Sequence, residues 1–286
     1  MQDSESNKDK IVATISNRNN FFLILILLLL IPACTQNIDD AEKLKQKIVK
    51  LSNAGKYSEA IPFAEKELQI KEKVLGPNHF EVAKSVDNIA SLYSSLGKYE
   101  KSLPLFKRSL IIYEKALSPE HPDIAKPLDN VAALYFVKGD FDKAEPLYKR
   151  SLAIREKKFG QEHPDVADSL HTLATLYKSK EEYEKAEPLY KRSLTIWEKA
   201  VGLEHPNVAS SLRSLAIIYY TKGEYEKAEP LYKRSLAIYE KAFGQEYPSI
   251  VTDLNNMAEL YRKLGEDEKA QAFLNRAEGM KKGIAP

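Results

Sequence analysis

Four histidines at a fixed spacing are the first residues that suggest chemistry. His79, His121, His163 and His205 lie 42 residues apart in E-H-P-D-like segments, and imidazole with carboxylate could bind a metal ion. If each repeat forms a helical hairpin, consecutive histidines lie about 10 Å or more apart. Zinc, however, holds its ligands at roughly 2 Å. We therefore predict that these histidines have a structural role at helix entries and that they bind no metal.

No other group of residues supports catalysis. The sequence has no phosphate-binding glycine loop, no H-E-x-x-H pair and no nucleophile elbow. His171 lies outside the periodic set, where it could contact a ligand, but a lone histidine is seldom catalytic. The sequence thus predicts a protein without enzymatic activity and without a cofactor.

Cys34 is the single cysteine, so an intramolecular disulfide is impossible. It follows the apolar run FFLILILLLLI, which spans roughly 16 Å as a helix, about half a bilayer core. This length suits a secretory signal over residues 1–33 better than a transmembrane helix. The segment Ile31-Pro32-Ala33-Cys34 resembles a bacterial lipobox, although Ile31 and Pro32 depart from its usual pattern and the leader is long.

The lipobox resemblance implies that Cys34 is lipidated and becomes the mature N-terminus, with residues 34–40 as a short tether. Several acyl chains would anchor the protein stably in the membrane. Thr35 after the cysteine implies the outer membrane, with the protein facing the periplasm. Two alternatives are an uncleaved signal anchor in the inner membrane and a Cys34 that is an idle thiol.

The charge balance gives no argument for nucleic-acid binding, since 43 basic and 41 acidic residues leave a net charge of +2. Lys-Arg pairs occur at 107–108, 149–150, 191–192 and 233–234, but they alternate with glutamates and lack an aromatic stacking platform. We interpret them as a solvated outer helix face. The pairs Glu145–Lys149, Glu187–Lys191 and Glu229–Lys233 are then exposed contacts worth about a few tenths of a kcal/mol each.

A repeat of 42 residues organises the sequence from residue 41 to residue 284. The segment KAEPLYKRSL begins at Lys143, Lys185 and Lys227. This register gives six units, the first of them degenerate: residues 33–74, 75–116, 117–158, 159–200, 201–242 and 243–284. One unit cannot bury its apolar face alone, so neighbouring units must stack into a continuous core.

Each unit is predicted to form two helices. In the third unit, Pro122 suits the first helical position and Gly139 suits a left-handed helix end. Between them, Leu128, Val131 and Tyr135 recur at helical spacing.

Two features depart from this pattern. The fourth unit has Glu181 at the glycine position, which predicts a strained or differently shaped turn. Pro104, Pro146, Pro188 and Pro230 lie inside the second helices, where proline removes a hydrogen bond and predicts a repeated bend.

The repeated columns resemble the tetratricopeptide repeat. In the third unit they are Leu128, Val131, Ala132, Tyr135, Gly139, Phe141, Ala144, Tyr148 and Ser151. The period, the E-H-P-D-V-A linkers and the EKAEPLYKRSL helices are similar to the kinesin-light-chain type of this repeat. The resemblance implies an all-α, right-handed superhelical solenoid of antiparallel hairpins, whose first helices line a concave groove that binds peptides. It implies no motor role, because the motor-binding parts have no counterpart.

By this resemblance, the groove is lined by first-helix residues that vary from unit to unit. An asparagine amide can donate to and accept from a peptide backbone, and lysine offers a positive charge to a carboxylate. The candidate binding residues are Lys84, Asn88, Lys126, Asp129, Asn130, His171, Arg213, Tyr220, Asn255 and Asn256. The alternative for each of them is an ordinary solvated polar surface without a ligand.

Two functions from different classes fit these observations. The first is a scaffold or adaptor that is tethered to the bacterial cell envelope and binds a protein or peptide in the groove. The second is a structural spacer or accessory subunit of an envelope enzyme or secretion complex, which would bury a large, flat, apolar surface. Tyr220 and Trp197, both expected to be exposed, could serve either function.

Overall fold

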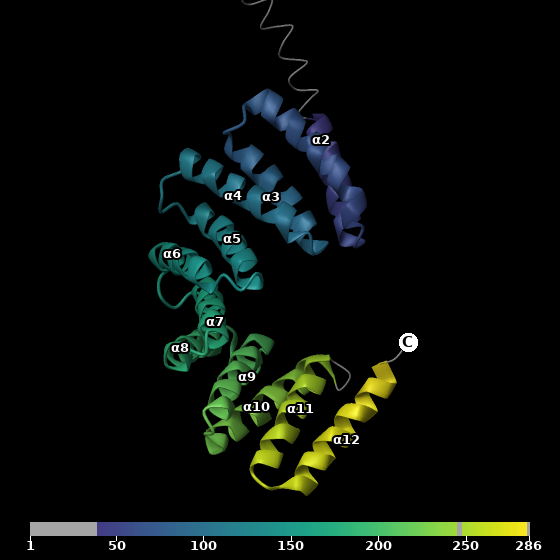
Figure 1. Ribbon diagram of the computed structural model, residues 1–286, viewed down its shortest axis with the longest axis vertical. Coiled ribbons are helices and arrows are strands. Elements are labelled where there is room, and N and C mark those ends of the chain that lie inside the picture. Colours follow the sequence, from purple (N-terminus) through teal and green to yellow (C-terminus); the bar gives the residue numbers. More distant parts are fainter. Residues whose placement is uncertain (1–38, 245–247, 285–286) are drawn as a thin grey trace, which may run out of the picture. The chain divides into compact units, whose positions relative to one another are not determined.

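The computed structural model describes residues 39–244 and 248–284 of the chain (Figure 1). The predicted signal sequence and Cys34 lie outside these residues. The described residues form helices and no strands, which confirms the all-α class. The chain divides into two compact parts, which we call the N-terminal part, up to Pro119, and the C-terminal part, from Glu120 onward.

The N-terminal part contains four described helices. They are a helix over residues 39–53, α2 (Tyr57–Leu75), α3 (Phe80–Ser95) and α4 (Tyr99–Ala116). The middle helix α3 packs against both α2 and α4. Val82, Ala83 and Val86 are fully buried at these contacts, and such small side chains let the helices approach closely.

The C-terminal part is a run of four hairpins. It contains the 3-10 helix η1 (Pro122–Ile124) and the helices α5 (Ala125–Val137), α6 (Phe141–Phe159), α7 (Pro164–Ser179), α8 (Tyr183–Val201), α9 (Pro206–Thr221), α10 (Tyr225–Phe243), α11 (Pro248–Lys263) and α12 (Asp267–Ile284). Each odd-numbered helix from α5 forms a hairpin with the next helix, and each even-numbered helix from α6 to α10 also packs on the following hairpin. This arrangement confirms an all-α repeat array.

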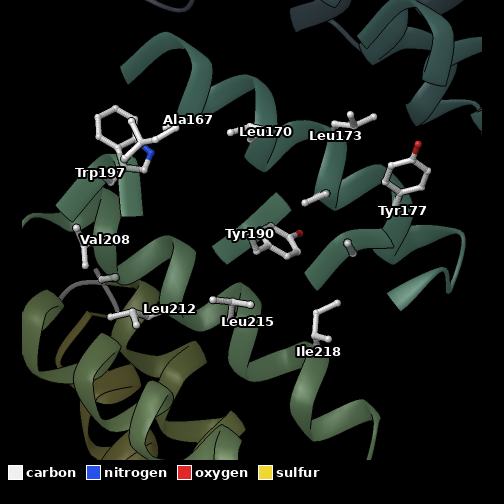
Figure 2. Close-up of a cluster of buried hydrophobic side chains, with 14 of the residues drawn as sticks. Ala167, Leu170, Leu173, Tyr177, Tyr190, Trp197, Val208, Leu212, Leu215 and Ile218 are labelled. Atoms are coloured by element: carbon white, nitrogen blue, oxygen red, sulfur yellow. The ribbon is translucent and has the colours of Figure 1, made fainter. Parts of the chain in front are cut away.

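A continuous core runs through these hairpins. Figure 2 shows the Tyr190 ring between the helices that carry Leu173 and Leu215, and the Tyr190 side chain is fully buried. Trp197 is also part of this core and is only 7% exposed, so the prediction of an exposed tryptophan was wrong. The repeat register explains the error, because Trp197 occupies the same position as the buried Tyr113 and Tyr239.

Buried serines join the two helices of four successive hairpins, from α3–α4 to α9–α10. Ser109 in the N-terminal part donates its hydroxyl to the Ala83 carbonyl at 3.0 Å, and Ser193 in the C-terminal part donates to Ala167 at 2.8 Å. The equivalent bonds are Ser151 to Ala125 and Ser235 to Ala209. A hydroxyl that would otherwise be buried without a partner is thereby satisfied.

The glycines that end the first helices have the predicted left-handed backbone, for example Gly139 with φ 78°. Glu181 adopts the same conformation with φ 61°. The hydrogen bonds of the two turns also match, because Glu182 N–H donates to the Tyr177 carbonyl as Asp140 N–H does to Tyr135. The turn at Glu181 is therefore strained and keeps the shape of the glycine turns, which is the first of the two predicted outcomes.

The second helices run without interruption through their internal prolines. Pro104, Pro146, Pro188 and Pro230 are all exposed. The carbonyl that each proline leaves without its helical donor lies one turn earlier on nearly the same face, where water can reach it. This position explains how the helices tolerate proline.

Candidate functional site

The candidate residues of the N-terminal part lie on α3. Lys84 and Asn88 are both exposed. Lys84 donates to the Glu81 carboxylate at 2.8 Å, and its ammonium group lies 4.0 Å from the centre of the Phe80 ring. Asn88 thus offers an accessible amide, while the charge of Lys84 is partly balanced by its own helix.

In the C-terminal part, the candidate residues lie on α5, α7, α9 and α11, the first helices of its four hairpins. Asp129, His171, Arg213 and Asn255 occupy the same repeat position on these four helices. We call the surface formed by this position and its first-helix neighbours the variable face. Its other candidate members are Lys126, which is exposed, and Asn130, Tyr220 and Asn256, which are partly exposed.

Asp129 has a strong partner on the second helix of its own hairpin. Arg155 donates to the Asp129 carboxylate at 2.6 Å and also to the hydroxyls of Ser151 and Ser169. Arg155 was not among the predicted residues, because it lies on α6 and not on a first helix. Comparison of the units would have found it, since the equivalent positions hold Tyr113, Trp197 and Tyr239.

A hollow of about 240 Å³ opens beside this ion pair. Burial, with the nearby Asp165 carboxylate, raises the pKa of Asp168, and the charge of Arg155 opposes this rise. The hollow therefore has an acidic character that suits a donor or cationic group. It is lined by Asp129, Arg155, Asp165, Asp168, Ser169 and Thr172.

His171 lies over the buried aromatic core. Its ring lies at 72° to the Tyr190 ring, with the ring centroids 5.0 Å apart. Burial, together with the charges of Lys178 and Arg213, lowers the pKa of His171 to about 4. The imidazole is therefore neutral at pH 7 and can both donate and accept a hydrogen bond.

Arg213 connects α9 to α10 and α11. Its guanidinium lies 5.2 Å from the Tyr239 ring centre, and one nitrogen approaches the Asp253 carboxylate at 3.5 Å. Asp253 is fully buried, and its second oxygen accepts a bond from the Ser235 hydroxyl at 3.0 Å. Burial raises the pKa of Asp253 to about 6, although Arg213 and Ser235 oppose this rise. Asp253 was not among the predicted residues, because its partners Arg213 and Ser235 come from the preceding repeat.

The remaining candidates have weaker contacts. Tyr220 packs against Tyr225 with ring centroids 5.6 Å apart. Lys126, Asn130, Asn255 and Asn256 reach solvent to different degrees. The assignment of these residues to a ligand stays a prediction.

The periodic histidines cap helices. The Nδ1 atom of His79 accepts from the Glu81 N–H at 3.1 Å, and His163 accepts from Asp165 at the same distance. His121 and His205 do the same at 3.2 Å. The predicted structural role at the helix entry is confirmed. In the part of the chain that the structure describes, no group of three or more His, Cys, Asp or Glu side chains could hold a metal ion.

The outer charged face is less solvated than predicted. Arg192 donates to Glu156 of the preceding hairpin, and Arg234 donates to Glu198, both at 2.6 Å. Each of these guanidinium groups thus reaches back to the second helix of the preceding hairpin. The Lys-Arg pairs thus supply one arginine that links neighbouring repeats, which corrects their interpretation as a simply solvated face.

The predicted Glu–Lys pairs are present and belong to the same network. Lys149 donates to Glu145 at 2.7 Å, and Tyr177 and Lys180 of the next hairpin donate to the same carboxylate. The hydrogen bond from Lys149, with those from Lys180 and Tyr177, outweighs burial and lowers the pKa of Glu145 to about 2. Lys191, Tyr219 and Lys222 surround Glu187 in the same way.

Among the described helices, none is both long and apolar enough to cross a membrane. This finding does not extend to the apolar run that ends at Ile31, which lies outside the described residues.

A family model for the tetratricopeptide repeat matches residues 49–115, 81–157, 123–199, 165–241 and 208–282. No curated protein matches the chain.

Several solved structures have a similar fold. BtubC (BKLC) from P. vanneervenii is 24% identical with a TM-score of 0.66, and the match covers 85% of this chain and 94% of that one. Kinesin-light-chain TPR-like repeats from Podosopora anserina are 26% identical with a TM-score of 0.63, covering 70% and 94% of the two chains. The apo form of RapI is 15% identical with a TM-score of 0.64, covering 85% and 98%.

Proposed function

Because the chain belongs to the tetratricopeptide repeat family, we propose that it is a non-enzymatic scaffold that binds a protein or peptide partner on the variable faces of its first helices. The observation that carries this proposal is the contrast between two sets of positions. The core positions hold the same small or apolar side chains in unit after unit, for example Ala132, Ala174 and Ala216. The variable face changes its chemistry at each step from Asp129 to His171 to Arg213.

This contrast is expected of a binding surface on a fixed frame. A fold that only needed solubility would place interchangeable charged residues there. Instead, His171 and Arg213 are partly buried and contact defined neighbours. Side chains held in this way lose little additional freedom when a ligand binds, which favours affinity.

We further propose that the protein is tethered to the bacterial cell envelope. The support is the sequence before residue 39, where the apolar run precedes a lipobox-like Cys34. Lipidation of Cys34 would place the array at the outer membrane, on the periplasmic side. The alternative is the inner membrane, with an uncleaved signal anchor.

The spacer or accessory-subunit function has one specific observation in its favour. Phe159, Val201 and Phe243 recur at the ends of the second helices and are 42%, 40% and 46% exposed, and the nearby Leu203 is 60% exposed. A row of exposed apolar side chains can mark a contact with another protein. A fixed subunit that covered these ends would leave the variable face free.

The deciding experiment is capture of partners from detergent-solubilised native membranes. We would compare the wild type with a variant that carries Asn88→Ala, Asn130→Ala and Arg213→Ala. A matched control would carry Lys157→Ala, Lys199→Ala and Lys241→Ala, which change three exposed residues of the second helices. Circular dichroism of each protein would verify that helicity is intact.

Loss of a partner from the first variant alone would support binding on the variable face. A partner that both variants retain would favour the spacer. Mass analysis of the same sample tests the tether separately, since a mature chain that begins at acylated Cys34 supports the lipoprotein and an intact Met1 supports the signal anchor.

A further inference from the structure

An open hollow of about 430 Å³ lies on α4 and on the linker between α2 and α3. We call it the α4 hollow, and it is lined by Pro77, Asn78, Pro104, Lys107, Arg108, Ile111 and Ile112. Ile111 is 51% exposed, and Pro77 and Pro104 are also exposed. The α4 hollow therefore presents apolar side chains to water on a second helix and a linker, and not on the first helices that carry the variable face.

Ile111 gives the α4 hollow its apolar character, although the repeat does not require a large side chain there. The same position of the following units holds Ala153, Thr195 and Ala237, which are all exposed. A single exposed isoleucine would need no explanation. This one, however, lies in a hollow with two exposed prolines, where another molecule could remove all three side chains from water.

The linker beside the α4 hollow lacks an ion pair that the following units have. In those units a linker glutamate binds a lysine of the second helix in the pairs Glu120–Lys157, Glu162–Lys199 and Glu204–Lys241. In the second unit, the corresponding residues are Asn78 and Lys115. The amide of Asn78 carries no charge, and Lys115 has no hydrogen bond or ion pair within the described residues. The second unit thus keeps the lysine and has lost its anion.

Lys115 is well placed to act together with the α4 hollow. It lies four residues after Ile111 on α4, so the two side chains share one face of the helix. Lys107 lies four residues before Ile111 and is part of the lining. Arg108, in contrast, already binds the Glu72 carboxylate. The charge that complements this surface is therefore negative, next to an apolar group.

We propose that the α4 hollow is a second docking site, which takes one large apolar side chain of a partner protein that has an aspartate or glutamate close to it. The apolar side chain covers Ile111 and the two prolines. The carboxylate binds Lys115, in the place that a linker glutamate has in the following units. The site goes beyond the proposed function, because it lies outside the variable face.

The shape of the α4 hollow favours a protein side chain over a lipid. A fatty acid also combines an apolar chain with a carboxylate, but sites for small molecules bury most of the surface of their ligand. Here the lining comes from one helix and one linker, and about half of Ile111 faces solvent. Such a hollow can cover a single side chain whose backbone stays outside, whereas a long acyl chain would remain largely in water.

The test uses the array without its leader, residues 35–286, which contains every described helix. A phage-displayed library of random peptides is first depleted on the double variant Asn78→Glu with Ile111→Ala and is then selected on the wild type. Both replacements copy residues that other units hold at these positions, so the hairpin is expected to fold, and circular dichroism with thermal melts verifies this. The depletion also removes peptides that bind the variable face, which the double variant keeps.

We expect the remaining peptides to share a large aliphatic or aromatic residue at one position, with an acidic residue close to it. Replacement of the apolar residue by alanine should weaken binding by about tenfold or more, as expected when one large side chain is no longer buried. Ile111→Ala alone should also weaken binding. Lys115→Gln should weaken it about threefold, the usual size of an exposed ion pair, and should reduce its dependence on salt.

The matched controls are Thr195→Ala, which shortens the exposed residue of α8 at the position of Ile111, and Lys158→Gln, which removes one charge from an exposed residue of α6. Both should bind the selected peptides as tightly as wild type. Weaker binding to either control would show that the peptides do not report on the α4 hollow, and would overturn the inference.

A selection that leaves no peptide after depletion would overturn this inference. So would selected peptides without a fixed apolar position, or peptides that bind Ile111→Ala as tightly as wild type. Dodecanoate that binds the wild type more tightly than any selected peptide does, and more weakly in Ile111→Ala, would assign the hollow to acyl chains and would also overturn it. None of these outcomes bears on the proposed function, which the variant with Asn88→Ala, Asn130→Ala and Arg213→Ala tests separately.

Discussion

Glu181 is a residue whose backbone conformation conflicts with its side chain. It has φ 61°, whereas the equivalent turns use Gly55, Gly97, Gly139, Gly223 and Gly265 in the same left-handed region. A residue with a Cβ atom pays an energetic penalty there that glycine avoids. The fold holds Glu181 in this conformation because the packed helices α7 and α8 of its hairpin fix the two ends of the turn.

Glu181→Gly is therefore expected to raise the free energy of unfolding by about 1 kcal/mol, as the strain of a non-glycine residue at positive φ is removed. Urea denaturation followed by circular dichroism would measure it. Glu184→Gly is the matched control, because Glu184 lies in the first turn of α8 and glycine in a helix costs roughly 1 kcal/mol. Equal destabilisation by both changes would contradict the assigned strain.

Asp253 is a second residue with a measurable signature, since burial raises its pKa from 3.8 to about 6 despite Arg213 and Ser235. In the folded protein it holds its proton to higher pH than in the unfolded chain. Stability contributed by this group is therefore present below pH 4 and is lost as the pH rises to about 6. The groups that face Asp253 are Arg213, Ser235 and Tyr232.

Asp253→Asn should lack this loss. Relative to wild type, its free energy of unfolding should rise between pH 4 and pH 7 by up to about 3 kcal/mol, from roughly 1.4 kcal/mol per pKa unit. Urea titrations at pH 4, 5, 6 and 7 would measure the difference, in which the other carboxylates cancel. A difference that does not change with pH would show that the pKa of Asp253 is ordinary.

At the scale of the helices, the sequence predicts well what repeats and poorly what does not. The helix ends at Gly139 and the capping role of His163 followed from period and residue type. Trp197 was misplaced, although its register position alone identified it as core. Arg155 and Asp253 were missed because their partners lie on other helices, so their contacts depend on how hairpins stack. Spacing within one helix carries no information about such contacts.

The first helices begin with an unusual cap, a histidine whose Nδ1 accepts a backbone N–H. His163→Ala should lower the free energy of unfolding by about 1 kcal/mol, the usual loss of an N-cap acceptor. His163→Asn should lose less, since asparagine caps helices well. Both changes also remove the stacking of His163 on Phe159, with ring centroids 4.5 Å apart. The difference between the two variants in urea denaturation therefore isolates the cap, and equal losses would exclude it.

At the scale of the whole molecule, stability in a repeat array depends on contacts between neighbouring units. In the C-terminal part of the chain, the second helices make two recurrent kinds of ion pair, one with the preceding repeat and one within their own repeat. The arginines Arg192, Arg234 and Arg276 bind Glu156, Glu198 and Glu240, with side chains 35–38% exposed. The lysines Lys157, Lys199 and Lys241 bind Glu120, Glu162 and Glu204, but their side chains are 58–68% exposed. The difference in exposure predicts that the arginines carry more of the coupling.

A variant with Arg192→Gln, Arg234→Gln and Arg276→Gln should lose about 1.5 kcal/mol of unfolding free energy, at roughly 0.5 kcal/mol for each partly exposed ion pair. The bonds from Arg192 to the Gln161 carbonyl and from Arg234 to Leu203 add geometric constraint to two of these pairs. The matched variant with Lys157→Gln, Lys199→Gln and Lys241→Gln removes the same charge and should show no measurable loss. Urea denaturation in 0.1 M and 1 M NaCl would separate charge from packing, because salt shortens the screening length from about 10 Å to about 3 Å. A loss for the arginine variant that shrinks in high salt assigns the coupling to ion pairs. A loss that persists assigns it to the packing of the arginine stems on the neighbouring helix, and an equal loss for the lysine variant would contradict the ranking by exposure.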